Sequence, residues 1–410
     1  DYHLSQEHII TFRWRNWSPF VLSHSELALA ADIVRDELAP RMRVAINRVM
    51  RECVIGFHNF DATLAGYASG TNIACCQNIN AGIAALAWGE ECGYSGWQEV
   101  VWKASETVRQ YLRHGCDPDG FSYEGAGYGH SMFIYVYLYA QLLKQRGVRD
   151  LFAEEPVLER IPDASQQMLL DNHSFAATAN DHGTFEPWSM WWLPLTAKYY
   201  GRSDHMGLWH AFQGPEHPIR PYGDVWPWFA KLAGPAPTPA LEEKPDPSLF
   251  SAFLWWDADA PVTPIRDSSL PLSQCAAGTG TATFRSTWER DGVFAIFLGA
   301  GRSHTCSWHA HLDCGHFGIS AYGQYLAIDT GRYNFTENQH NLVMIEGRER
   351  HRDLQPGDGM GCDMTGGRLC DFMRGGFASY CRADAAQIKD CRWADRHFLF
   401  VNTPDGGAYV

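Results

Sequence analysis

The feature that most constrains this fold is the proline-rich segment Gly234–Leu249, which carries five prolines in sixteen residues. Proline lacks a backbone N–H and has a fixed φ angle, so such a segment is neither a helix nor a central strand and makes a stiff linker. The chain of 410 residues is also longer than one typical domain. We therefore predict two domains, residues 1–233 and 250–410, joined by a linker at 234–249.

Residues before the linker show the period of amphipathic helices, as in Trp97–His114, which ends at a glycine. Helices of similar length joined by polar, glycine-rich loops are typical of stacked hairpins, so we predict an (α/α) toroid. The predicted helical segments are 25–54 with a break at Pro40, 81–91, 97–114, 131–145, 156–170 and 188–200.

After the linker the pattern changes to short apolar runs separated by Gly, Asp and Asn, which predict antiparallel strands. The predicted strands are 282–288, 292–298, 316–321, 325–328, 341–346 and 398–401. The fold class we predict is therefore α+β, a helical toroid followed by an antiparallel β-sandwich. Because His397–Val410 reads as a strand, a turn and the start of another strand, we expect the β-domain to be incomplete at its C-terminus.

Net charge excludes some partners. With 33 Lys and Arg against 47 Asp and Glu, the formal charge is −14, which argues against nucleic acid and anionic membranes. No apolar run is long enough to span a bilayer. The 16 Trp and 17 Tyr suit a carbohydrate cleft, although core packing explains most of them. The 12 Cys show no disulfide spacing, and free thiols favour a reducing compartment.

Histidines and carboxylates gather in Cys306–Asp329. His309, His311 and Asp313 alternate, so on an extended strand they would share one face. A neighbouring strand would bring Asp329 beside them, and His340 follows in a short loop. Two histidines and a carboxylate from adjacent strands suit a divalent ion such as zinc. The other interpretation, a set of ordinary hydrogen-bonded histidines, stays open from spacing alone.

Two further stretches carry polar residues that suit a ligand. Residues 119–130 form a glycine-rich stretch before a predicted helix, with Glu124, Tyr128 and His130, and they read equally as a plain helix connection. Asn72 and Asn78 precede another predicted helix, where Asn is most often a cap. Residues 172–186 form a polar loop that either lines a sugar cleft or lies on the surface.

The runs at 284–288, 309–317, 327–333 and 340–347 resemble, in this order, those of the heparinase II/III-like polysaccharide lyases. The His-x-His-x-Asp and His-Asn-x-Val patterns are the most specific of them. The stretch 119–128 resembles the loop that carries the catalytic Tyr of that family, and 72–78 resembles its Asn-bearing segment. The resemblance implies a toroid plus β-sandwich and β-elimination at a uronic acid of an acidic polysaccharide.

The resemblance also implies residue roles. Asn72 would neutralise the uronate carboxylate, Tyr128 would act as the acid and also as the base, and His309 would assist. The metal ligands would be His311, Asp329 and His340, holding zinc rather than manganese or calcium. The side chains predicted to bind substrate are Asn78, Glu124, His130, His173, Trp188 and Arg302.

Alternatives to a lyase remain open on the sequence. One is a toroidal glycoside hydrolase, which needs two facing carboxylates, with Glu124 and Asp181 as candidates. Another is a carbohydrate-binding protein without catalysis. The polysaccharide substrate favours a periplasmic or secreted location, whereas the free cysteines favour the cytoplasm. The oligomeric state is not predicted.

Overall fold

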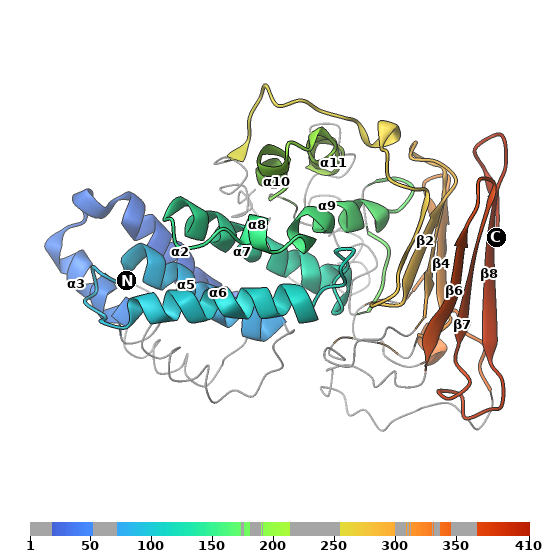
Figure 1. Cartoon of the computed structure of the whole chain (residues 1–410), viewed down its shortest axis with the longest axis horizontal. Coiled ribbons are helices and arrows are strands. Elements are labelled where there is room, and N and C mark those ends of the chain that lie inside the picture. The colour runs from blue at the N-terminus through green and yellow to red at the C-terminus, as the bar shows by residue number, and fades with distance from the viewer. Residues whose placement is uncertain are drawn as a thin grey trace, which may run out of the picture. The chain divides into compact units, whose positions relative to one another are not determined.

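The structure is a computed structural model that describes residues 19–51, 72–173, 176–180, 190, 192–213, 255–299, 309, 311, 313–329, 331, 337–345 and 367–410. Helices are followed along the chain by two antiparallel sheets, so the fold class is α+β as predicted (Figure 1). The predicted linker lies outside the described residues, and the domain boundary there stays a prediction. No described helix has the length and apolar content needed to cross a membrane.

By its contacts the chain forms two compact units. The first comprises Asp1–Gly115 with Tyr135–Pro156, and the second comprises Cys116–Ile134 with Val157–Val410. The described helices of the first unit are α2 (Pro19–Ile33), η2 (Arg35–Glu37), α3 (Pro40–Val49), α5 (Asn72–Trp88), α6 (Trp97–His114), the later turns of α7 (Gly125–Gln145), and α8 (Leu151–Glu154).

Close helix packing organises the first unit. Helix α6 has the predicted bounds and buries an apolar stripe that includes Val101 and Val108. Gly82 of α5 lies so close to α6 that a Cβ there would be 2.6 Å from the Cβ of Ala104. The Tyr139 hydroxyl of α7 donates a hydrogen bond to the Val101 carbonyl at 2.8 Å. Glycine and backbone hydrogen bonding thus let these helices approach closely.

The start of α5 corrects one prediction. The helix begins at Asn72, so Asn78 and Asn80 lie inside it rather than in a stretch before it. The Asn80 side chain donates a hydrogen bond to the carbonyl of Cys76 at 2.8 Å, one turn earlier. An Asn that bonds back to its own helix is tolerated in the interior. The predicted break at Pro40 is confirmed, since proline is the first residue of α3.

The second unit contains a five-stranded sheet in the order β1-β2-β3-β4-β5 and a four-stranded sheet in the order β6-β7-β8-β9, both antiparallel. Phe284 and Phe297 of the first sheet share one core with Phe398 and Phe400 of the second, and the Phe284 and Phe398 ring centroids are 5.1 Å apart. Face-to-face packing of two sheets through such a core is the sandwich arrangement. The elements of this unit are the first turns of α7, α9 (Val157–Gln167), α10 (Leu193–Tyr200), α11 (Ser203–Gln213), η4 (Ile265–Asp267), β1 (Ser273–Ala276), β2 (Thr281–Arg285), β3 (Val293–Leu298), β4 (Phe317–Ala321), β5 (Gln324–Ala327), η5 (Glu337–Gln339), β6 (Arg368–Arg374), β7 (Ala378–Asp384), β8 (Asp395–Asn402) and β9 (Ala408–Tyr409).

The strand prediction was right for β2, β3, β4, β5 and β8 and wrong at 341–346. Residues 341–345 form no strand, because the Asn341 side chain donates to the carbonyls of Phe317 and Ile328 at 2.9 and 3.0 Å and so holds an irregular loop. Helices α8 and α11 and strands β1, β6 and β7 were not predicted, whereas β9 is the second strand expected within His397–Val410. In β7 the buried positions are Ser379, Cys381 and Ala383, which are small and only weakly apolar, so the alternation is faint in the sequence.

The segment that follows α9 is fastened to the first sheet. Arg285 of β2 is fully buried, donates a hydrogen bond to the Leu169 carbonyl, and lies over the rings of Trp288 and Phe294. The Gln167 side chain accepts a hydrogen bond from Thr283 at 3.2 Å. These contacts group α9 with the sheets in one compact unit.

Candidate active site and metal centre

Tyr128 lies in the first turns of α7, which begins at Gly125 rather than at the predicted position 131. The run of glycines read as a loop, but crowding explains them. A Cβ on Gly129 would be 2.5 Å from the Cβ of Ser122, and one on Gly125, which has φ +83°, would be 2.7 Å from the carbonyl of Ala179. Glycine is therefore required where this helix start packs against its neighbours.

The chain leading to Tyr128 is held on both sides. The Asp117 carboxylate accepts hydrogen bonds from the backbone N–H of Gly278 at 2.6 Å and of Asp119 at 2.9 Å. The Asn180 side chain donates to the carbonyl of Tyr123 at 3.1 Å. These bonds tie the approach to α7 to the β1–β2 turn and to the segment that follows α9, and so define the position of Tyr128.

Tyr128 and His309 are stacked. Their ring centroids are 3.6 Å apart and the ring planes differ by 14°. His309 is buried and has φ +70°, a left-handed conformation, so it is not in the extended strand that we predicted. His309 therefore stacks on Tyr128, whereas His311 lies with Asp329 and His340 in a separate group. A phenol and an imidazole that lie side by side are suited to moving a proton to and from one ligand.

His311, Asp329 and His340 form a second group. They come from the segment before β4, the segment after β5 and the residue after η5, and one ligand atom from each lies within 4.8 Å of the others. All three are buried. The Asp329 carboxylate accepts hydrogen bonds from His340 Nδ1 at 2.8 Å and from the Gly331 N–H at 2.7 Å. This places the three predicted metal ligands together.

The donor set of this group fits a zinc-like ion. Because a carboxylate only accepts, His340 Nδ1 carries the proton, and Nε2, which has no hydrogen-bond partner among the described residues, keeps a lone pair. A carboxylate that orients a histidine in this way is the usual support of a metal ligand. His316 does not qualify in its neutral form, since its Nδ1 accepts from the Asn341 N–H at 3.0 Å and its proton is then on Nε2.

The pKa values of His316, Asp329 and His340 are shifted by burial and by neighbouring charges. Burial lowers the pKa of His316 to about 4, although Asp329 opposes the shift. Burial would raise the pKa of Asp329, but the hydrogen bond and charge of His340 lower it overall. Burial would lower the pKa of His340, but the hydrogen bond to Asp329 and the neighbouring carboxylates raise it overall. Without a metal, His340 therefore takes up a proton more readily than a free histidine, and an ion bound at its Nε2 would displace that proton.

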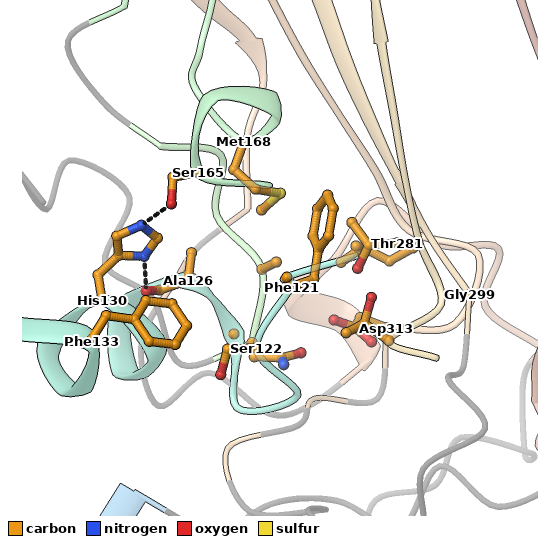
Figure 2. Close-up of a pocket in the computed structure, with 16 residues that line it drawn as sticks. Phe121, Ser122, Ala126, His130, Phe133, Ser165, Met168, Thr281, Gly299 and Asp313 are labelled. Carbon is orange, nitrogen blue, oxygen red and sulfur yellow. Dashed lines mark hydrogen bonds between the residues drawn. The ribbon is translucent and has the colours of Figure 1, made fainter. Parts of the chain in front are cut away.

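A small cavity lies beside the first turns of α7. Figure 2 shows Phe121, Thr281 and Asp313 grouped on one side of it, with His130 and Ser165 on the other. The volume open to water centres is about 40 Å³, room for roughly three waters. Asp313 is buried, burial raises its pKa to about 6, and its Oδ2 has no hydrogen-bond partner among the described residues. Alternation had placed Asp313 beside the histidines but assigned it no role.

His130 braces the helix start. Its Nδ1 donates to the Ala126 carbonyl at 2.7 Å, and its Nε2 bonds to the Ser165 hydroxyl at 2.8 Å. Both ring nitrogens are therefore engaged within the protein, joining α7 to α9 (Figure 2). Substrate binding by His130 stays a prediction.

The other predicted residues are dispersed. Asn72, buried at the start of α5, and half-buried Asn78 belong to the first unit, while buried Glu124 and His173 belong to the second. Their roles stay predictions. Trp188 and Arg302 lie outside the described residues.

His173 makes acid stability a testable property. Burial, helped by the charges of Arg285 and Arg290, lowers its pKa to about 3. Between pH about 6.5 and 3 the unfolded chain therefore binds a proton that the folded chain does not, and the free energy of unfolding falls as pH drops, by about 1.4 kcal/mol per unit. Asn tolerates the local φ of +57°, so His173→Asn should fold. We expect the slope of its free energy of unfolding against pH to be smaller than that of the wild type by the equivalent of about one proton, measured by urea titrations at several pH values.

The matched control is His114→Asn at the exposed end of α6, which should keep the wild-type slope. An unchanged slope in His173→Asn would show that this histidine is not held neutral.

The chain has the fold of heparinase-type polysaccharide lyases. No protein-family model and no curated protein sequence matches it. Heparinase III matches with a TM-score of 0.56 at 12% identity, over 97% of this chain and 60% of that one. Another heparinase III structure matches with a TM-score of 0.52 at 12% identity, over 90% and 52%. A heparan sulfate lyase from Pedobacter heparinus matches with a TM-score of 0.48 at 13% identity, over 97% and 53%. The chain thus spans about half to three fifths of the length of these structures.

Proposed function

We propose that this chain is a polysaccharide lyase that cleaves uronic-acid-containing polysaccharides by β-elimination. Glycosaminoglycans such as hyaluronan, chondroitin or heparan sulfate come before alginate as substrates. The observation that carries the proposal is the stacking of Tyr128 on His309 at 3.6 Å. The fold shared with heparinase III supports it. In this proposal the helices form the (α/α) toroid of such lyases.

The chemistry sets three demands on the residues. The uronate C5 proton is weakly acidic, so a donor on the neighbouring carboxylate must stabilise the charge that develops, and we assign Asn72 to this role. A base removes the proton, its electron pair forms the double bond to C4, and the C4–oxygen bond breaks. An acid then protonates the leaving oxygen. We assign Tyr128 as acid and base.

His309 is the assisting group. A free tyrosine has a pKa of about 10, so a proton-accepting or charged neighbour is needed before a phenol acts as a base near neutral pH. The buried imidazole of His309 lies nearly parallel to the Tyr128 ring and is the neighbour that we assign to this role. The remaining substrate contacts are proposed for Asn78, Glu124, His173, Trp188 and Arg302. Of these, Arg302 supplies the positive charge that a chain with a net charge of −14 needs to hold a polyanion.

We further propose that His311, Asp329 and His340 hold a divalent ion, zinc before manganese or calcium, because two of the three ligands are imidazoles. Such an ion would crosslink the segments before β4, after β5 and after η5. His309 would then remain available to the substrate.

The experiment that tests this function is analysis of the products that form in water labelled with oxygen-18. A lyase adds no water, so the products from heparan sulfate should carry no label and should contain an unsaturated uronate end. A glycoside hydrolase, which would need Glu124 to face a second carboxylate such as Asp181, would incorporate the label. A carbohydrate-binding protein would give no product. Labelled products, or none from any uronate polymer, would overturn the proposal.

A further inference from the structure

The segment that carries His340, residues 337–341, is fastened at its first residue by the second sheet. Lys389, in the connection between β7 and β8, bonds through Nζ to the Glu337 carboxylate at 2.7 Å. Both side chains are buried, with Lys389 5% and Glu337 1% exposed. A buried ion pair contributes little net stability because both charges are desolvated. A role in positioning accounts for it better.

The same segment is fastened at its last residue by a second cation of that sheet. Arg396 of β8 donates from Nη1 to the Asn341 carbonyl at 2.6 Å. Its guanidinium lies over the Phe317 ring at 4.8 Å, which fixes the direction of the side chain. Lys389 and Arg396 therefore hold the residues at the two ends of the segment.

His340 lies between these two anchors. Its backbone N–H bonds to the carbonyl of Glu337 at 3.2 Å, so the residue held by Lys389 also holds His340. On the other side, the Asn341 N–H bonds to His316 at 3.0 Å. Residues 341–345 have no strand ladder to orient them. The imidazole itself is oriented by its bond to Asp329, and the Asn341 side chain bonds to Phe317 and Ile328, so Lys389 and Arg396 add the contacts that join this segment to the second sheet.

We infer that Lys389 and Arg396 are positioning residues of the metal centre, which hold segment 337–341 so that His340 meets His311 and Asp329. This inference rests on the proposed metal site. Without Lys389 and Arg396, segment 337–341 would have to be ordered when the ion binds. The entropy cost of that ordering would weaken the metal affinity. Removal of residues that orient metal ligands typically weakens metal binding about tenfold to a hundredfold.

The test uses the whole chain with Lys389→Met and Arg396→Met. Zinc affinity is measured by calorimetry with a competing chelator, and hydrogen exchange of residues 337–341 is measured without metal. We expect each variant to bind zinc about tenfold more weakly and to exchange faster in this segment. Lys389→Arg, which keeps the cation, should restore both properties. The matched control is Arg382→Met on β7, whose ion pairs reach Asp371 and Asp395.

The outcomes separate the two proposals. Wild-type zinc affinity in both Met variants would overturn the positioning role and leave the metal site intact. Absence of zinc binding to the wild type would overturn the metal site, and the inference with it. If Lys389→Met fails to fold, the other two variants still decide the question. We predict that Arg396→Met loses zinc affinity and that Lys389→Arg retains it.

Discussion

A Tyr128→Phe variant is expected to turn over the polysaccharide about a hundredfold to ten-thousandfold more slowly, the effect of removing a general acid–base group. The reason is that the phenol hydroxyl would carry the proton in both halves of the elimination. Phenylalanine keeps the ring that stacks on His309 at 3.6 Å, so folding and substrate affinity should change little. Initial rates on a uronate polymer, with circular dichroism and thermal unfolding of the same samples, check this prediction.

The matched control is Tyr123→Phe in the same stretch of chain. The Tyr123 hydroxyl lies against Gly278 in the β1–β2 turn, and Tyr123 has no role in the proposed chemistry. We expect this variant to keep wild-type rates within a few-fold. Full activity in Tyr128→Phe would assign the acid and base to other residues, whereas equal losses in both variants would indicate a structural effect.

His311→Ala is expected to lose metal and stability together, because binding to the folded chain alone stabilises that state. At zinc concentrations a hundred to a thousand times the dissociation constant, the free energy of unfolding should fall by about 3–4 kcal/mol relative to wild type. In excess chelator the difference should shrink to the packing loss of one buried imidazole. Metal analysis and urea titrations with and without zinc measure both quantities.

His397→Ala on β8 is the control for removal of a histidine. Its ring is exposed and bonds to the Tyr380 hydroxyl, remote from the metal ligands in sequence. We expect this variant to keep its zinc and its stability. A full zinc content in His311→Ala would show that the ion binds at residues other than this group.

The apolar pattern of the sequence was sufficient for elements whose buried residues form a regular stripe or a continuous run. Helix α6 has the predicted bounds, because its apolar stripe is regular and Gly115 ends it. Strands β3 and β4 follow their apolar runs to within one residue. Spacing predicted that Asp329 and His340 lie near the histidines of Cys306–Asp329, and the choice of His311, Asp329 and His340 as the ligands came from the resemblance to lyases.

The errors have a common physical cause, which is tertiary contact that overrides local preference. Glycines before position 131 indicated a loop, but they are the residues that fit where α7 packs against Ser122 and Ala179. Alternation predicted that His309 is extended, but its left-handed backbone turns it toward Tyr128. None of these contacts has a signature in a single sequence.

The most direct measurement is the ultraviolet absorbance of the unsaturated uronate end while the purified chain is incubated with heparan sulfate, hyaluronan, chondroitin and alginate. We predict a steady rise with at least one glycosaminoglycan, which Tyr128→Phe abolishes. A flat trace with every polymer, from a folded and zinc-loaded sample, would contradict the assignment of elimination chemistry to this site.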